Sequence, residues 1–350
     1  MDKSVMDKYV SNIAYHMKDF YKDLTFYKDG KIDLPEIENL IFLGIGGSAI
    51  SPKIFTEIMN TNKKAYFFSA LSGHEILPDP SKSFVMAFSY SGNTVETLKS
   101  IELIAKDGFK GIGVSSGGKI VDLCKDLNWQ HISVPKDRAP RAAMPFTLSI
   151  LFKLALSKKW TEYNEGDFWN DIIELSNSKN NFLPEVDFED NISKRIAYKL
   201  YSKKNIIIWG VESISKNIAY RFKSQLEENA KQLSYYSYLP EASHNQIVPI
   251  SLVNNKEEYI VLIFRIPQSE SILVSNIIST VKTFLNSEGV EVLEIFGSGK
   301  NHVLAGLDLI YSTDFASYYL ALLKGIEPEP IEPISRMKVI LNDNLRKVLL

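Results

Sequence analysis

Cysteine is almost absent from the 350-residue chain, which contains Cys124 alone. A single cysteine cannot form a disulfide within the chain, and this favours a reducing compartment. Cysteine and histidine nowhere cluster with the spacing of a zinc site. A run of 18 apolar residues is also missing, so we expect no transmembrane helix and no membrane association. The first residues mix acids with bases and lack the apolar run of a signal peptide, which leads us to expect a cytoplasmic protein.

An excess of positive charge is lacking as well. Forty Lys and Arg residues stand against 42 Asp and Glu residues, which gives a net charge of −2. A dedicated nucleic-acid-binding protein usually carries a basic surplus, so we expect no nucleic-acid partner. The 45% of hydrophobic residues excludes a disordered chain, and the length suggests two domains or one large one.

Residues 1–38 are polar and mixed in charge. Within them, Met6, Val10, Ile13 and Met17 recur at the spacing of one helix face. The segment is too short for a helix-turn-helix unit with its linker, so a packing helix is the better interpretation. We therefore predict an N-terminal helical extension over residues 1–38.

The next part of the chain alternates short apolar runs with helical patterns. The runs end at glycines or polar turns, as buried parallel strands do. This alternation predicts βαβ units, and hence a mostly parallel sheet with helices on both faces, in a first domain of residues 39–180. The expected strands are 40–45, 64–68, 84–88, 111–114 and 131–134, with helices over 48–59, 95–106 and 147–175.

A second pattern of the same kind follows a polar stretch, and we place a linker at residues 181–202. We predict a second domain over residues 203–350 that includes a C-terminal helix. The predicted fold class is α/β, with two domains that each hold a mostly parallel sheet between helices in flavodoxin-like layers. A ligand in such a fold binds at the carboxyl ends of the strands or between the domains. The expected strands are 205–210, 234–238, 259–264 and 290–295, with helices over 213–230, 270–286 and 303–323.

A glycine-rich loop, Gly44–Ala49, follows the first expected strand and opens a helix. Glycines let the backbone approach an anion, and a helix N-terminus offers it free N–H groups. Gly47 and Ser48 are therefore candidate phosphate-binding residues. The loop also fits the loose dinucleotide pattern G-x-G-x-x-A, but positions 63–69 lack the acid that would hold a ribose. A turn without any ligand is the remaining alternative.

A second polar turn, Ser89–Thr94, lies between the third expected strand and its helix. The hydroxyls of Ser89, Ser91 and Thr94 are neutral donors that can hold a phosphate together with backbone N–H groups. An N-capping loop is the structural alternative, because serine and threonine are favoured caps. Two such turns in one sheet favour phosphate binding, while the lack of a G-x-x-x-x-G-K-[ST] motif excludes a nucleotide P-loop.

The two turns together resemble those of the sugar isomerase (SIS) domain. Further segments match, in order and spacing, the family of bifunctional phosphoglucose/phosphomannose isomerases of archaea and some bacteria. The resemblance covers roughly residues 39–340 and implies two SIS domains, a homodimer, and a mechanism with no metal and no redox cofactor. The matching segments are Pro140–Ala143, Glu227–Lys231, Pro240–Asn245 and Asp314–Ala321, followed by Gly325, Pro328 and Lys338.

Three candidate residues can be weighed by their own chemistry. Arg141, just past a strand end, can bind phosphate, stabilise an oxyanion or form a surface salt bridge. Glu228 lies at the C-terminal end of a helix, where the dipole disfavours a charged carboxylate. This suits a base working near neutral pH, although most helical glutamates are solvated. His244, unlike the other histidines, lies in a loop of small polar residues, where it is either an acid/base group or a structural residue.

The resemblance implies an aldose–ketose isomerase that interconverts glucose 6-phosphate and mannose 6-phosphate with fructose 6-phosphate. Glu228 would move a proton between C2 and C1 through a cis-enediol, and Arg141 would hold the developing negative charge. His244 and Lys338 would assist ring opening, and in this family the histidine can come from the partner subunit. The assignment of Lys338 rests on the resemblance alone.

Two other functions stay open at this point. One is a non-catalytic sugar-phosphate-binding SIS protein, although SIS regulators usually carry a DNA-binding module and none is visible here. The other is a Rossmann-type dehydrogenase, which the missing ribose-binding acid disfavours. A glutamine-dependent glucosamine-phosphate synthase is disfavoured too, because it needs an N-terminal cysteine nucleophile and Cys124 lies in mid-chain.

Overall fold

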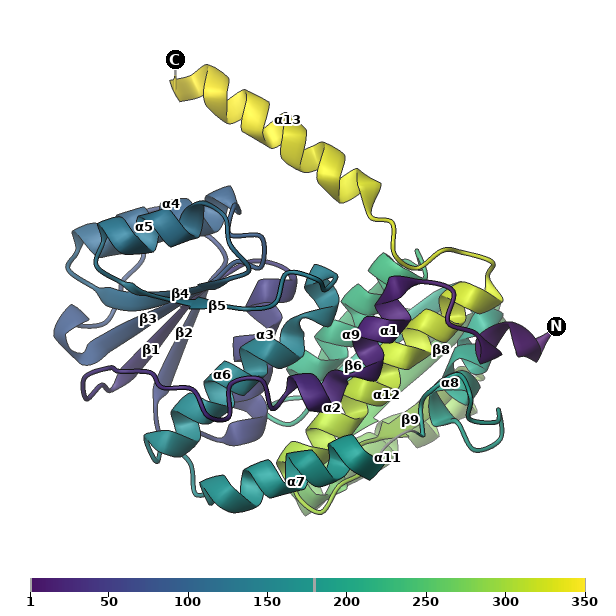
Figure 1. Ribbon diagram of the computed structural model, residues 1–350. Helices are drawn as coiled ribbons and strands as arrows, with labels where there is room; N and C mark the ends of the chain where they lie inside the picture. The colour runs from purple at the N-terminus through teal and green to yellow at the C-terminus, as the bar shows by residue number, and fades with distance from the viewer. Residues whose placement is uncertain (1, 179–180, 350) are drawn as a thin grey trace.

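Two parallel β-sheets form the framework of the computed structural model, which describes residues 2–178 and 181–349 (Figure 1). The strand order is β2-β1-β3-β4-β5 in the first sheet and β7-β6-β8-β9 in the second, and every neighbouring pair is parallel. The predicted α/β fold class with two parallel-sheet domains is therefore confirmed. The strands are β1 (Asn39–Leu43), β2 (Lys64–Phe68), β3 (Ser83–Phe88), β4 (Lys110–Ser115), β5 (Gln130–Ser133), β6 (Asn205–Val211), β7 (Ser234–Leu239), β8 (Tyr259–Arg265) and β9 (Glu291–Phe296).

The first sheet is buried on both faces, because its central strands are apolar beyond their first residue. In β1, Ile41 and Leu43 face one hydrophobic cluster with α4 and α5, whereas Leu40 and Phe42 face another with α3 and α6. This two-sided burial explains the unbroken apolar runs in the sequence. The helices of this domain are α3 (Gly47–Met59), α4 (Val95–Lys106), α5 (Lys119–Asp126), α6 (Met144–Ser157) and α7 (Glu165–Ser178).

Helix α12 forms the centre of the second domain. It contacts α8, α9 and the N-terminal extension, and nearly all of its residues are buried. Tyr311 and Tyr318 of this helix hold the extension, since their hydroxyls donate to the carbonyls of Lys18 at 3.0 Å and Lys8 at 2.8 Å. A helix that packs against other elements on every side is apolar over most of its surface, and its few buried polar residues need partners. The helices are α8 (Ile192–Tyr201), α9 (Lys216–Asn229), α10 (Ile247–Leu252), α11 (Ile272–Ser287), α12 (His302–Leu323) and α13 (Glu332–Leu349).

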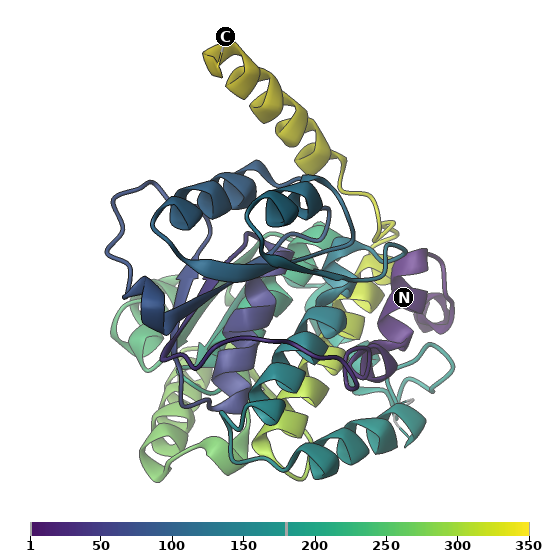
Figure 2. The same cartoon turned by 60° about the vertical axis from the view of Figure 1, so that its left-hand side comes forward.

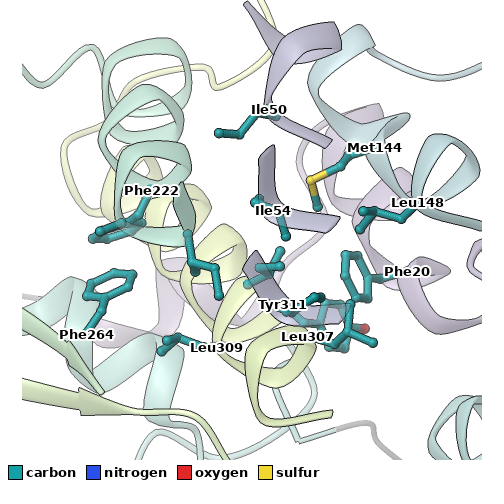
Figure 3. Close-up of a cluster of buried hydrophobic side chains, with 14 of the residues drawn as sticks. Phe20, Ile50, Ile54, Met144, Leu148, Phe222, Phe264, Leu307, Leu309 and Tyr311 are labelled. Atoms are coloured by element: carbon teal, nitrogen blue, oxygen red, sulfur yellow. The ribbon is translucent and has the colours of Figure 1, made fainter. Parts of the chain in front are cut away.

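The two domains share one hydrophobic core. Figure 3 shows Ile50 and Ile54 of α3 between Met144 of α6 and Phe222 of α9. Helix α3 thus belongs to the first sheet and packs on the second domain at the same time. This joint core fixes the loops of the first sheet relative to α9, and it is this relation that builds the site described below.

The N-terminal extension is helical, but it does not form the single helix that the periodicity predicts. Three of the four periodic residues are buried, whereas Val10 lies between helices and is 52% exposed. The helix is interrupted because the backbone of Ser11 is extended, with φ −149° and ψ 161°. The observed elements are the 3-10 helix η1 (Lys3–Asp7), α1 (Asn12–Lys18) and α2 (Phe20–Asp23).

Two further predictions need correction. The predicted helix over residues 147–175 is two helices, α6 and α7, because Lys159 takes a left-handed conformation with φ 54° after the end of α6. The segment 181–202, predicted as a linker, contains α8, which packs against α12 and buries Ile196 and Leu200. The second half of this segment therefore packs as part of the second domain. The predicted end of the first domain at residue 180 lies outside the described residues.

Helix α13 stands away from both domains in Figure 1 and in the rotated view of Figure 2. Ile334, Met337 and Ile340 are exposed, although their spacing places them on one face of the helix. The sequence predicts a C-terminal helix but says nothing of its position. In the part of the chain that the structure describes, no helix combines the length and apolar character needed to cross a membrane.

Candidate active site

The glycine loop and the Ser/Thr turn meet at the carboxyl edge of the first sheet, because β1 and β3 are neighbours. Helix α3 begins after Gly46 and α4 after Thr94, and neither N-terminus has a side-chain cap. The alternative interpretation of the Ser/Thr turn as an N-capping loop is therefore disfavoured. Two uncapped helix N-termini at one sheet edge offer free N–H groups to an anion.

Hydrogen bonds hold the hydroxyl groups of these two loops. Ser89 Oγ donates to Thr94 Oγ1 at 3.0 Å, and Ser48 Oγ accepts the Tyr90 N–H at 3.3 Å. Ser89 is buried, whereas Ser91 at the tip of the turn is exposed. The turn therefore presents the exposed Ser91 hydroxyl above a hydrogen-bonded pair, the buried Ser89 and the half-buried Thr94.

A cavity of about 10 Å³ lies between the loops and is lined by Gly47, Ser48, Ser89 and Thr147. Thr147 is a hydroxyl that the sequence analysis did not single out. It lies in the first turn of α6, directly after the segment that carries Arg141. The third hydroxyl comes from a different part of the chain, so only the folded sheet edge brings it to the other two.

Arg141 lies beside the glycine loop on the short helix η3 (Pro140–Ala142) and is 4% exposed. Its Nε donates to Asn229 Oδ1 at 2.7 Å, and its Nη2 donates to the carbonyls of Pro328 at 2.9 Å and Glu329 at 3.2 Å. Burial lowers the pKa of this guanidinium, but an arginine stays charged in proteins. These bonds fix the guanidinium plane and direct Nη1 toward Glu228.

Glu228 Oε2 lies 3.7 Å from Arg141 Nη1, an ion pair too long to be a hydrogen bond. Both side chains line a cavity of about 50 Å³ together with Gly46 and Gly47. The Glu228 side chain is 29% exposed, so a ligand can reach it. A carboxylate and a fixed positive charge therefore flank one opening beside the glycine loop.

A buried polar network that the sequence analysis missed holds Arg141. Arg221 makes a bidentate ion pair with Asp314 of α12 at 3.0 and 2.6 Å, and its Nη2 also donates to the Arg141 carbonyl at 2.9 Å. Gln225 donates to the same Asp314 at 3.0 Å. Arg221, Gln225 and Asn229 recur every four residues on the buried face of α9. That polar periodicity is visible in the sequence and could have identified them.

Lys231 brings a second positive charge to the end of α9. Its Nζ donates to the carbonyls of Glu228 at 2.5 Å and Pro328 at 3.0 Å. Burial, and next the nearby charge of Arg141, lower the pKa of this lysine. Lys231 thereby ties the helix end that carries Glu228 to the loop that precedes α13.

His244 and Lys338 do not line the cavity of Arg141 and Glu228 within the single chain. His244 ends the 3-10 helix η4 (Glu241–His244) after β7, and it is exposed. Lys338 is exposed on α13, which stands away from both domains (Figure 1). The structure thus brings Arg141 and Glu228 together beside the glycine loop, and the roles of all four residues stay predictions.

The described residues contain no group of three or more His, Cys, Asp or Glu side chains that could hold a metal ion. Cys124 is buried against the first sheet, and burial raises the pKa of its thiol to about 11. Such a thiol is a poor nucleophile near neutral pH, because the reactive form is the thiolate.

A family model described as the bacterial phospho-glucose isomerase C-terminal SIS domain matches residues 189–341. A curated relative from Thermoplasma volcanium, named bifunctional phosphoglucose/phosphomannose isomerase, is 30% identical over 89% of this chain and 92% of that protein. The chain belongs to this family. Further curated relatives with the same name are 26% to 28% identical to the chain.

Two more comparisons place this member of the phosphoglucose/phosphomannose isomerase family among its neighbours. A curated D-glucosamine-6-phosphate 4-epimerase from Sulfolobus acidocaldarius is 30% identical over 68% of this chain and 72% of that protein. A solved structure of a hypothetical protein from Thermus thermophilus superimposes with a TM-score of 0.75 at 14% identity, over 98% of this chain and 92% of that chain. At such low identity this likeness supports the two-domain fold alone.

Proposed function

We propose that the chain is an aldose–ketose isomerase that interconverts glucose 6-phosphate and mannose 6-phosphate with fructose 6-phosphate through a cis-enediol. The observation that carries this proposal is the Glu228 carboxylate opposite Arg141, in a cavity that the glycine loop also lines. The names of the curated relatives support the same two activities. The reaction needs a base and a partner for a negative oxygen, and it transfers no electrons to a redox cofactor.

Glu228 is the base in this mechanism. Its carboxylate takes the proton from C2 of the open-chain aldose phosphate. The electron pair of that C–H bond forms the C1–C2 double bond, and the π electrons of the C1 carbonyl move to O1, which takes up a proton and becomes a hydroxyl. Glu228 then returns its proton at C1, while the C2 hydroxyl becomes the ketone and releases a proton that balances the one taken up by O1. Because C2 loses its configuration in the enediol, glucose 6-phosphate and mannose 6-phosphate converge on one intermediate.

Arg141 stabilises the negative charge that develops on the substrate oxygens in this step. Its Nε and Nη2 are already bound to protein acceptors, so the guanidinium does not have to reorganise during the reaction. Nη1 faces the same opening as the base. The phosphate of the substrate would lie against Gly47, Ser48, Ser89, Ser91 and Thr94.

A Ser91→Asp change is expected to raise KM for fructose 6-phosphate at least ~10-fold, because the new carboxylate repels the substrate phosphate. Steady-state kinetics measure the effect. Ser287→Asp is the matched control, since it adds the same charge at an exposed serine on α11. A KM for Ser91→Asp within about twofold of wild type would argue against phosphate at this turn.

A second copy of the chain would complete the site. The cavity of about 50 Å³ beside Glu228 has room for only one or two waters, so a hexose phosphate needs further walls. His244 adjoins α10, on which Val248 and Leu252 are exposed. Ile272 and Leu273 are exposed on α11, which packs against α10. An apolar surface beside a candidate acid/base residue supports a homodimer in which His244 enters the partner's site.

Lys338 reaches the site in this proposal if α13 folds against the domains of either copy. The segment that precedes α13 already lies at the site, because Arg141 donates hydrogen bonds to the carbonyls of Pro328 and Glu329. Gly325, with φ 66°, ends the preceding helix and gives the chain a turn at this point. Folding of α13 would also bury its exposed apolar face.

Mixed dimers test whether His244 acts across the subunit interface. We expect His244→Ala and Glu228→Gln to be nearly inactive alone. After co-refolding of equal amounts, half of the dimers are mixed, and each mixed dimer has one intact site out of two. The mixture should therefore regain about a quarter of the wild-type activity. The coupled isomerase assay measures the recovery, and the two variants mixed without subunit exchange are the control. If both variants are inactive and refolding recovers nothing, the subunits do not share His244.

The test of the function is a coupled assay with glucose 6-phosphate and mannose 6-phosphate, with and without EDTA. Formation of fructose 6-phosphate from both substrates is expected, at a rate that the chelator does not change. Activity lost to EDTA would count against a metal-free mechanism. Lack of turnover with both substrates, combined with saturable fructose 6-phosphate binding, would indicate a sugar-phosphate-binding protein without activity.

A second candidate function is C4 epimerisation of an amino sugar phosphate. The relative from Sulfolobus acidocaldarius favours it, because it is as similar to this chain as the isomerase from Thermoplasma volcanium over the part it matches. NMR of glucosamine 6-phosphate incubated with the protein separates the two. An inverted C4 signal without any ketose product would replace the isomerase proposal.

A further inference from the structure

Away from the candidate active site, the structure holds a much larger cavity of about 870 Å³ between the two domains. One wall is the carboxyl edge of the second sheet, where Ser213 follows β6, Ser269 follows β8 and His302 begins α12. The opposite wall is the chain just beyond the ends of α3 and α6. The volume falls in the range of roughly 300–1,000 Å³ that is typical of small-molecule sites.

This cavity lies where the second domain has its counterpart of the sugar-phosphate site. The order β2-β1-β3-β4 of the first sheet corresponds to β7-β6-β8-β9 of the second. In the first sheet, the glycine loop follows β1 and the Ser/Thr turn follows β3. In the second, the loops after β6 and β8 line the large cavity. In an open parallel sheet, ligands bind outside the carboxyl ends of the strands, at the point where the strand order reverses.

A carboxyl group of the protein already occupies the anion position of the second domain, which is the N-terminus of α9. Helix α9 follows β6 as α3 follows β1, but the N-terminus of α9 is not free. The N–H of Asn217 donates to Glu57 Oε2 at 2.9 Å, and Glu57 comes from α3 of the first domain. The N–H group that would face a phosphate in the first domain is therefore already satisfied here, which disfavours a phosphorylated ligand.

The charge of the remaining walls also disfavours an anion. Two helices, α3 and α6, end at the cavity, and helix C-termini carry partial negative charge. Lys159 is the basic lining residue and is balanced by the acid Glu162. Burial lowers the pKa of His302, which keeps the imidazole neutral. Burial raises the pKa of Glu57 to about 8, so this carboxyl is largely protonated at neutral pH.

The neutral polar groups of the large cavity can form hydrogen bonds with the hydroxyl groups of a ligand. His302 Nε2 lies 3.2 Å from the Glu57 carbonyl, which can only accept, so Nε2 carries the hydrogen. Nδ1 is then an acceptor, and Ser269 donates to it at 2.5 Å. The lone pairs of Ser269 Oγ stay available to a ligand hydroxyl. Asn62, Thr61 and the ring of Tyr163 line the same space.

We propose that this cavity is a second ligand site, which takes a small, uncharged, hydroxyl-rich molecule such as an unphosphorylated sugar or a polyol. The proposal rests on the topology, the lining groups and the occupied anion position, and it is independent of the isomerase activity. A phosphorylated sugar would place its charge against two helix C-termini and find the matching N–H group already bound.

Isothermal titration with glucose, mannose, fructose and sorbitol tests the proposal, with inorganic phosphate present to fill the Ser/Thr turn. We expect saturable binding of at least one of these compounds, with one site per chain, at concentrations up to about 50 mM. No saturable binding of any of them would overturn the proposal. So would a second molecule of glucose 6-phosphate that binds to the large cavity in preference to the uncharged sugars.

Variants place the binding in this cavity rather than at the active site. Ser269→Ala removes the positioned hydroxyl and is expected to weaken binding about fivefold. Thr61→Trp places a large ring in the cavity and is expected to weaken binding further. Ser287→Ala is the matched control, because it removes an exposed serine hydroxyl on α11 that bonds only locally to the Phe284 carbonyl. Thermal melting checks the fold of each variant. If either folded cavity variant binds the sugar as the wild type does, the site is elsewhere.

Discussion

Replacing Glu228 by glutamine is expected to lower kcat by at least ~10²-fold with little change in KM. Glutamine keeps the shape of the side chain opposite Arg141, but it cannot accept the C2 proton. The loss falls on kcat because the base acts in the transition state and not in binding. Steady-state kinetics with fructose 6-phosphate measure it. In deuterated water, exchange of the C2 proton of glucose 6-phosphate should also disappear.

Glu227 supplies the matched control, because it is the adjacent carboxylate on the same helix. Its Oε2 pairs with Lys223 Nζ at 2.6 Å, and neighbouring helix positions point about 100° apart. Glu227→Gln is therefore expected to change kcat by less than about threefold. Proton exchange near the wild-type rate in Glu228→Gln would show that the base is another residue, and Glu241 would be the next to examine.

Replacing Arg141 by lysine is expected to lower kcat by ~10²-fold or more, although the charge is kept. Lysine lacks the planar fork that binds Asn229 and the Pro328 carbonyl while Nη1 points at the substrate. The change also leaves buried acceptors without donors, so the free energy of unfolding should fall by about 1–3 kcal/mol. Thermal melting gives the fraction of folded protein. The kcat calculated per folded molecule then separates the loss of catalysis from the loss of stability.

Arg138→Lys is the control for this prediction, because Arg138 lies on the same loop and is also ion-paired. Its Nε donates to Asp23 Oδ2 at 3.2 Å, which ties the N-terminal extension to the loop. We expect it to destabilise the protein while kcat stays within about threefold of wild type. Equal losses of kcat in both variants would mean that Arg141 shapes the loop and does not stabilise the reacting oxygens.

The element order could be read from the sequence because strands and helices have different periods, and the central strands of both sheets are continuous apolar runs. The predictions that were wrong concern positions where neither periodicity nor an apolar run marks the structure. Lys159 turns the chain after α6 in a left-handed conformation that usually calls for glycine or asparagine. The polar stretch before α8 looks like a linker, but α8 itself buries one face on α12.

In the candidate site, too, the local features could be predicted from the sequence, and the long-range contacts could not. The Ser/Thr turn and the glycine loop are local, so their chemistry was visible in short stretches of sequence. Arg141 and Asn229 are 88 positions apart, and only the joint core of α3, α9 and α12 brings them to 2.7 Å. The sequence could mark Arg141 as a candidate, but it could not distinguish a site residue from a surface salt bridge.

The sequence by itself determined the two α/β domains, the glycine loop and the Ser/Thr turn, and, through its motifs, the family. Local periodicity and turn chemistry specify these features without long-range contacts. Only the tertiary structure decided that Arg141 faces Glu228, that Glu57 occupies the anion position of the second domain, and that a large cavity opens opposite it. Such pairings depend on how two sheets pack through one shared core, because the packing of distant side chains sets which groups meet.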